Sequence, residues 1–200
     1  MQSNQSNQSN TNKPTHPGSS DVSNAIPDVT ECFLVRGNKN QHIQEILLGR
    51  KKLGLGAGKF VGIGGKVELG ETIIAATLRE IHEEIGVHII EADLQPVGVL
   101  TFLFPHKLQW SMRAYTYQAW HWQGEPSETR EIEPLWVDVN AIPHEQMWGD
   151  TRFWMAHAFR GYQVDATFIF GEDNATVVDA QMHCAWPGVK SGNTQSPARF

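Results

Sequence analysis

The sequence predicts an α/β fold in which a mixed, curved β-sheet carries a helix on each side. Short apolar and β-branched runs, separated by turn-forming residues, recur along most of the chain. Two stretches between them instead repeat their apolar residues with helical spacing. This mixture of strand and helix signals indicates one α/β domain.

Composition divides the 200 residues into one folded domain and two polar ends. Residues 1–27 open with the repeat "MQSNQSNQSN" and have too little apolar surface to bury, so we predict a disordered tail. Residues 28–185 contain the strand and helix signals and form the predicted domain. Residues 186–200, "WPGVKSGNTQSPARF", are predicted to be a flexible C-terminal tail.

Seven runs have the composition of strands: 31–37, 45–51, 97–104, 111–122, 135–139, 162–170 and 175–183. The segment "PHKLQ" lies between the third run and the fourth, which predicts a hairpin. The last two runs flank "GEDN", a strong turn signal, and predict another hairpin.

Two helices are predicted, over residues 72–85 and 151–160. In the first, Ile74, Leu78, Ile81 and Ile85 form an amphipathic stripe, and Gly86 follows where helices commonly end in the left-handed conformation. The second, "TRFWMAHAFR", ends before a glycine, and the preceding Asp150 has the side chain of a good N-cap.

Charge and cysteine content exclude several classes of function. The formal net charge is -6, whereas proteins that bind long nucleic acid have a basic face. The two cysteines, Cys32 and Cys184, predict neither a disulfide framework nor a zinc site, so we expect reduced thiols. No apolar run has the length of a membrane span, and no secretory signal is visible. We therefore expect a cytoplasmic monomer that binds neither membranes nor long nucleic acid.

An acidic turn of the first helix indicates a metal site. Glu80, Glu83 and Glu84 lie within one turn and are expected to face outward, opposite the apolar stripe, with Arg79 as the only cation of the turn. Like charges at this spacing repel each other, and a solvated acidic face is the simpler interpretation. A divalent ion shared with phosphate would offset the repulsion, and Mg²⁺ prefers such oxygen ligands. The preceding "GIGGK" offers backbone without side chains beside that ion.

Other known motifs do not fit the glycine-rich and acidic stretches of this sequence. "HEEIG" lacks the second histidine of a zinc-protease helix. "GAGKF" and "GGKVE" lack the spacing and the Ser or Thr of a P-loop.

The segment 65–87 resembles the Nudix hydrolase signature, G-x5-E-x7-R-E-U-x-E-E-x-G-U, in which U is a bulky aliphatic residue. The matching residues are Gly65, Glu71, Arg79, Glu80, Ile81, Glu83, Glu84, Gly86 and Val87. The resemblance implies a Nudix fold, an α/β/α sandwich around a mixed sheet, and hydrolysis of a nucleoside diphosphate linked to another group. It implies that Glu80, Glu83 and Glu84 hold Mg²⁺ or Mn²⁺, often with a backbone carbonyl near Gly64, while Arg79 pairs with Glu71.

Two further stretches, "LLGRKKLGLGAGKFVGIGGKVELGETI" and "PLWVDVNAIPHEQMWGDTRFW", resemble the MutT-like oxidised purine nucleoside triphosphatases. The similarity covers about residues 30–180 but is patchy outside these stretches. That resemblance implies that Trp148 stacks on the base and that Asp150 reads its edge. It also implies that Phe60 and Phe102 line the pocket, and that Glu131 lies near the metals. The general base is left open among Glu80, Glu83, Glu84 and Glu131.

Two positions depart from the subfamily pattern. Val61 replaces an asparagine that contacts the purine, and Thr151 replaces a second aspartate. The loss of hydrogen-bonding groups from a pocket strongly changes which bases it can distinguish, so the preferred base is left open. The first hypothesis is hydrolysis of oxidised purine nucleoside triphosphates such as 8-oxo-dGTP. The alternatives are another Nudix substrate (an unmodified nucleotide, ADP-ribose or a dinucleoside polyphosphate) and a nucleotide-binding module without turnover.

Overall fold

The computed structural model describes residues 26–38, 42–186 and 198–199 of the chain. Within them, nine strands form one sheet: β1 Asp28–Gly37, β2 Ile43–Lys51, β3 Phe60–Val61, β4 Leu94–Leu103, β5 Met112–Ala119, β6 Ile132–Asp138, β7 Gln163–Phe170, β8 Val177–Ala185 and β9 Ala198–Arg199. The two α-helices are α1 Ile73–Ile85 and α2 Thr151–Ala158. Short 3₁₀ turns span Glu91–Asp93, Leu108–Trp110 and His144–Gln146.

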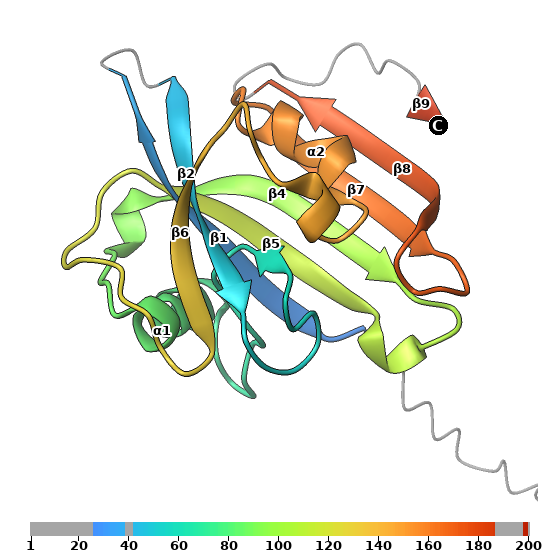
Figure 1. The fold of residues 1–200 in the computed structure, drawn as a ribbon, viewed down its shortest axis with the longest axis horizontal. Coiled ribbons are helices and arrows are strands. Elements are labelled where there is room, and N and C mark those ends of the chain that lie inside the picture. The colour runs from blue at the N-terminus through green and yellow to red at the C-terminus, as the bar shows by residue number, and fades with distance from the viewer. Residues whose placement is uncertain (1–25, 39–41, 187–197, 200) are drawn as a thin grey trace, which may run out of the picture.

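The sheet is mixed, as predicted. Its strand order is β3-β2-β1-β5-β4-β7-β8-β9, and β6 pairs with β2 (Figure 1). The pairs β1–β5 and β4–β7 are parallel, whereas the other pairs are antiparallel. Both predicted hairpins are present as β4–β5 and β7–β8. The short strand β3 was not predicted, because two residues carry no periodicity.

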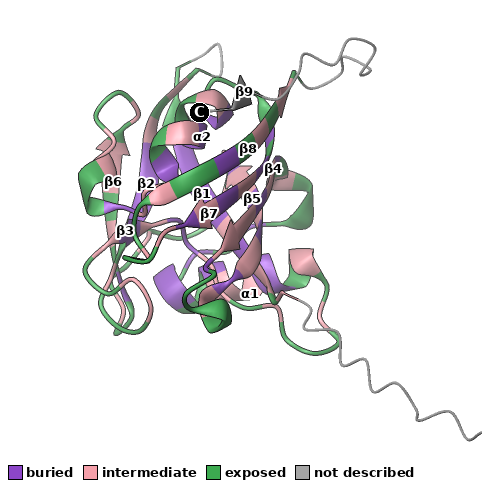
Figure 2. Ribbon diagram, turned by 90° about the vertical axis from the view of Figure 1, so that its right-hand side faces the viewer, coloured by how far each residue is buried: buried purple, intermediate pink, exposed green. Residues whose placement is uncertain are grey.

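The helices lie on opposite sides of the sheet (Figure 1), which confirms the predicted fold class of an α/β/α sandwich. Alternation along β1 explains this arrangement, because successive side chains of a strand point to opposite faces. Phe33 and Val35 enter the core formed with α2, whereas Cys32 and Leu34 enter the core formed with α1. Figure 2 shows buried stretches, in purple, along the strands between the two helices.

The predicted tails, 1–27 and 186–200, lie almost wholly outside the described residues. Trp186, the first residue of the second tail, is half exposed. Near the other end of this tail, Ala198–Arg199 pair with β8. Cys32 and Cys184 are both free thiols, as expected. Of the helices in the described part of the chain, none combines the length and apolarity needed to cross a membrane.

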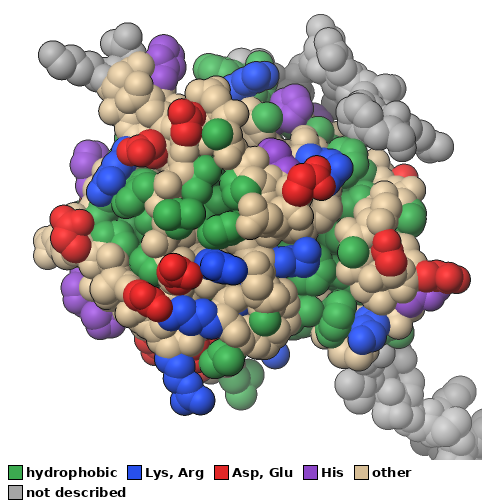
Figure 3. All heavy atoms as spheres, in the orientation of Figure 1, with side chains coloured by type: hydrophobic (Ala, Val, Ile, Leu, Met, Phe, Trp, Pro, Cys, Tyr) green, Lys and Arg blue, Asp and Glu red, His purple; other side chains and the backbone are tan. Residues whose placement is uncertain are grey.

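On the face seen in Figure 3, Lys and Arg side chains lie interspersed with Asp and Glu. A basic stripe, which long nucleic acid would require, is not visible on this face.

Candidate active site

Helix α1 presents the acidic turn, and both of its ends are capped. The Thr72 hydroxyl accepts a hydrogen bond from the Ala75 N–H at 3.1 Å, which satisfies one free donor of the first turn. Gly86 ends the helix with φ 77°, and its N–H donates to the His82 carbonyl, as the glycine predicts. These caps fix where the helix begins and ends, and the burial of Ile81 and Ile85 fixes its rotation above the sheet.

That rotation differs from the predicted one in one respect. Ile81 and Ile85 are fully buried, but Glu84 is also buried, with 6% of its surface exposed. The prediction that all three carboxylates face outward is therefore wrong for Glu84, which lies at the edge of the buried face. Glu83 remains exposed.

Arg79 binds three carboxylates at once. Its Nε and Nη2 donate to the two oxygens of Glu71, both at 3.0 Å. Its Nη1 donates to Glu80 at 2.8 Å and to Glu83 at 3.0 Å, and Nη2 also donates to the Lys66 carbonyl at 3.1 Å. The guanidinium hydrogen bond lowers the pKa of Glu71, and its carboxylate partners raise the pKa of Arg79. One cation thus holds the acidic turn against the preceding loop.

The glycine loop lies directly against β1 and the acidic turn. A Cβ on Gly64 would come within 2.1 Å of the Thr30 carbonyl oxygen, and one on Gly65 would lie 2.6 Å from the Glu80 carboxylate. The Gly64 N–H donates to the Glu84 carboxylate at 2.9 Å. Side chains larger than hydrogen do not fit here, so the glycines allow the backbone to touch both carboxylates.

Glu84 is an acid of this turn whose ionisation the fold disfavours. Burial raises its pKa to about 7, and the nearby charges of Glu80 and Glu131 raise it further. The hydrogen bond from the Gly64 N–H and the charge of Lys51 act in the opposite direction. The sequence-predicted acids Glu80, Glu84 and Glu131 are therefore close enough to interact.

The donor set fits a hard divalent cation in chemistry, because it consists of carboxylate and carbonyl oxygens. In the part of the chain that the structure describes, however, no three acidic, His or Cys side chains already converge on one point. The reason is visible in the hydrogen bonds, since Arg79 binds Glu80 and Glu83 while Glu84 binds Gly64. A cation would have to compete with the guanidinium for two of its ligands.

A cavity of about 260 Å³ lies against the same glycine loop and has mostly apolar walls. Gly62, Gly64, Gly65 and Lys66 of the loop contribute to its lining. All six residues predicted to bind substrate also line it: Phe60, Val61, Phe102, Trp148, Asp150 and Thr151. The structure thus brings together positions that lie up to about 90 residues apart in sequence.

Trp148 combines two roles that the sequence left open, because it packs on the core and lines the cavity. Phe104, Trp110 and Phe170 meet its ring edge-on, with centroids 5.9, 6.4 and 6.2 Å away. The Lys59 ammonium lies 5.1 Å from the ring centroid and donates to the Met147 carbonyl. This packing holds the indole in place beside the cavity.

Asp150 does not cap α2, contrary to the expected alternative. Its backbone is already helical and its side chain makes no capping hydrogen bond. Instead, the buried carboxylate accepts the Trp154 indole N–H at 2.9 Å, and burial raises its pKa to about 6. Thr151 is also turned away from a ligand role, because its hydroxyl donates to the Trp148 carbonyl and lies 3.0 Å from His144 Nδ1.

Sequence reasoning missed Glu31, which also lines the cavity. Its carboxylate accepts the Gly62 N–H at 3.1 Å. Burial raises its pKa to about 7, and the charge of Asp150 raises it further. A signal was available, because Glu31 shares the strand face of the buried residues Phe33 and Val35.

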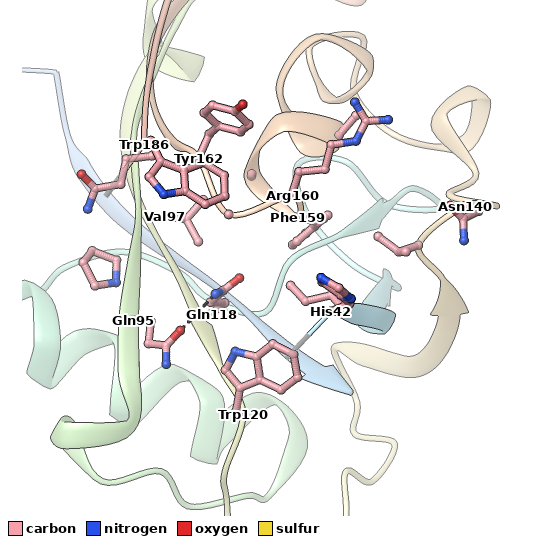
Figure 4. Close-up of a pocket in the computed structure, with 17 residues that line it drawn as sticks. His42, Gln95, Val97, Gln118, Trp120, Asn140, Phe159, Arg160, Tyr162 and Trp186 are labelled. Carbon is pink, nitrogen blue, oxygen red and sulfur yellow. Dashed lines mark hydrogen bonds between the residues drawn. The ribbon is translucent and has the colours of Figure 1, made fainter. Parts of the chain in front are cut away.

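A larger hollow, of about 870 Å³, is lined by residues that include His42, Gln95, Trp120, Arg160, Tyr162 and Trp186 (Figure 4). Gln118 also lines this hollow, and its side-chain amide donates a hydrogen bond to Gln95 at 3.1 Å. The lining shares no residue with the predicted site. The smaller cavity beside the glycine loop is therefore the candidate active site.

Comparison with known proteins finds relatives in sequence and in fold. A family model described as the NUDIX domain matches residues 27–158. An oxidized purine nucleoside triphosphate hydrolase from Danio rerio is 42% identical over 109 residues, covering 54% of this chain and 68% of that protein. The protein of the same description from Mus musculus is 39% identical over 111 residues, covering 56% and 69%. A mutator MutT protein from Bacillus halodurans is similar in fold, with a TM-score of 0.65 and 21% identity, covering 78% of this chain and 97% of that one.

Proposed function

Because the chain belongs to the Nudix hydrolase family, we propose that it hydrolyses nucleoside triphosphates to monophosphate and pyrophosphate, with oxidised purines such as 8-oxo-dGTP as substrates and Mg²⁺ as cofactor. The observation that carries the proposal is the position of the glycine loop. Gly64 contacts Glu84, and Gly65 lies against Glu80. Both glycines also line the aromatic cavity. A base in the cavity would place its phosphates next to the acids.

The acidic turn serves the phosphates in this proposal. Glu80, Glu83 and Glu84, with the Gly64 carbonyl and Glu131, would hold the cation. When bound, Mg²⁺ would neutralise the negative charge on the phosphoryl oxygens and lower the pKa of the attacking water. One of the four carboxylates takes the proton from that water.

Arg79 and Glu71 act as positioning residues. Their two parallel hydrogen bonds fix the guanidinium, which in turn fixes Glu80 and Glu83 beside the loop. The acids are thereby held in place before substrate arrives, which limits the reorganisation that catalysis requires.

The cavity serves the base. Trp148, Phe60 and Phe102 supply aromatic surface, and stacking on such surfaces contributes about 1–3 kcal/mol per base. Asp150 lies in the same lining and is buried, so a hydrogen bond from a base to it would form in a water-poor environment.

A panel of substrates tests the proposal. We expect Mg²⁺-dependent hydrolysis with the highest kcat/KM for 8-oxo-dGTP or 2-hydroxy-dATP, compared with dGTP, dATP, ADP-ribose and a dinucleoside polyphosphate. Glu84→Gln is expected to keep the fold and lower kcat by orders of magnitude, because a metal-ligand charge is lost. The matched control is Glu91→Gln, an exposed acid beyond the end of α1. Turnover of Glu84→Gln close to that of the control would contradict the assignment.

A second candidate is hydrolysis of a different nucleoside diphosphate derivative. Val61 and Thr151 favour it, since both line the cavity where the subfamily pattern has an amide and a carboxylate. A panel profile that is flat, or highest for ADP-ribose or a dinucleoside polyphosphate, would select this candidate. A binding module without turnover is less consistent with an acidic turn in which all three glutamates are present.

A further inference from the structure

Strand β1 places a carboxylate where the strand pattern calls for an apolar side chain. Residues 29, 31, 33 and 35 share one face of the strand, and Phe33 and Val35 on that face are buried in the core beside α2. Glu31 occupies the same face, and together with Val29 and Phe33 it lines the cavity. A charged side chain in such a position needs a compensating interaction.

The glycine loop is shaped around this side chain. The Gly62 N–H donates to Glu31 Oε1 at 3.1 Å, which orients the carboxylate. A Cβ on Gly62 would lie 2.3 Å from Glu31 Cγ, so only glycine leaves the space that Glu31 fills. The loop that touches the acidic turn through Gly64 therefore also fixes Glu31.

Glu31 and Asp150 are the two acids of the cavity lining. They come from β1 and from the start of α2, and they are close enough for their charges to interact. In the described part of the chain, no ion pair joins either of them to a cation, and most of the surrounding wall is aromatic or aliphatic. Two hydrogen-bonding carboxyls thus meet in a site otherwise suited to stacking.

We propose that Glu31 is a specificity-determining residue, which reads the edge of the bound base together with Asp150 and restores the polar contacts that Val61 and Thr151 lack. A carboxylate accepts N–H groups, and a guanine-type edge presents the ring N–H and the exocyclic amine side by side. The ligand class is therefore a purine nucleotide with adjacent N–H donors. This inference rests on the proposed function, because it assumes that a nucleotide base occupies the cavity.

Glu31→Gln tests the inference with little change in shape, because the amide oxygen can still accept the Gly62 N–H. The matched control is Glu133→Gln, an exposed glutamate on β6 of the same sheet. Selectivity is measured as the ratio of kcat/KM for 8-oxo-dGTP to that for dATP, whose ring nitrogen beside the exocyclic amine is an acceptor. We expect Glu31→Gln to change this ratio by about 10- to 100-fold, the usual effect of one lost base contact, and the control to leave it unchanged.

Two results overturn the inference. One is a ratio equal to that of the unmodified protein. The other is an equal loss for every nucleotide, since that would mean that Glu31 only supports the glycine loop. Melting temperatures of the variants separate either result from misfolding.

A binding measurement separates this inference from the proposed function. The dissociation constants of 8-oxo-dGMP and dAMP are measured by titration of the tryptophan fluorescence, without turnover. If the unmodified protein hydrolyses none of the panel, the proposed function fails, and the inference then depends on binding alone. A weaker affinity of Glu31→Gln for 8-oxo-dGMP, but not for dAMP, supports it, whereas equal affinities overturn it.

Discussion

Replacement of Asp150 by asparagine is predicted to stabilise the protein at pH 8. The Asp150 side chain is buried, with 3% of its surface exposed, and accepts the Trp154 indole N–H at 2.9 Å. Asparagine keeps the acceptor oxygen but removes the charge. Burial raises the pKa of Asp150 from 3.8 to about 6, a difference of about 2 pH units. At about 1.4 kcal/mol per unit, the ionised side chain costs the folded state about 3 kcal/mol.

The sign of the effect depends on pH. Because the pKa is higher in the folded than in the unfolded state, the folded protein binds the proton more tightly. The resulting stability is complete below about pH 4 and is lost as the pH rises to about 6. The free energies of unfolding of the variant and the unmodified protein should therefore be similar at pH 4 and differ by up to about 3 kcal/mol at pH 8. Urea denaturation at both pH values measures the difference.

Asp173→Asn is a matched control with the opposite expectation. In the "GEDN" turn, Asp173 accepts the N–H groups of Ala175 and Thr176 and the Thr176 hydroxyl. These hydrogen bonds lower its pKa to about 2, so its charge stabilises the fold above pH 4 and this contribution is lost as the pH falls towards 2. The control variant should be less stable than the unmodified protein at pH 8. Equal stability of Asp150→Asn and the unmodified protein at pH 8 would refute the reasoning, because it would mean that the ionised side chain reaches water.

Two further predictions concern the candidate site. Trp148→Ala should raise KM through lost base stacking, by the equivalent of about 1–3 kcal/mol; an unchanged KM in a folded variant would assign Trp148 to core packing alone. Gly65→Ala should lower kcat, because the new Cβ would lie 2.6 Å from the Glu80 carboxylate and would displace it from its hydrogen bond with Arg79. The melting temperature should change little, because only the end of the Glu80 side chain has to move. Unchanged kcat in Gly65→Ala would show that the position of Glu80 is not critical.

Features encoded by adjacent residues could be predicted from the sequence. Helix α1 begins and ends within one residue of its prediction, since a cap and a left-handed glycine mark its ends. The β7–β8 hairpin follows from its turn residues. Both are local features, whose energetic cause lies within a few residues of chain.

Features that depend on tertiary packing could not be predicted. A helical wheel places Glu84 on the outward side, because it treats the helix as isolated and does not contain the loop that covers that position. Asp150 has the side chain of an N-cap, but a partner four residues away, Trp154, takes its carboxylate. Glu31 contacts the glycine loop through Gly62, which is 31 residues away along the chain.

The two acids of the cavity lining also bear on function through stability. Glu31 and Asp150 are both harder to ionise in the folded protein than in water, so each of them weakens the fold at neutral pH. Each carboxyl accepts a hydrogen bond, Asp150 from the Trp154 indole and Glu31 from the Gly62 N–H. A neutral amide could accept the same hydrogen bonds without the cost of ionisation, so these bonds alone give no reason for a carboxyl at either position. The acids of the acidic turn on α1, by contrast, are held by Arg79 and the glycine loop. Perturbed acids that no cation compensates, and that line a cavity, are typical of binding and catalytic sites. If Glu31 and Asp150 bind the base, the substitutions that stabilise the protein at pH 8 should be the same ones that reduce its selectivity.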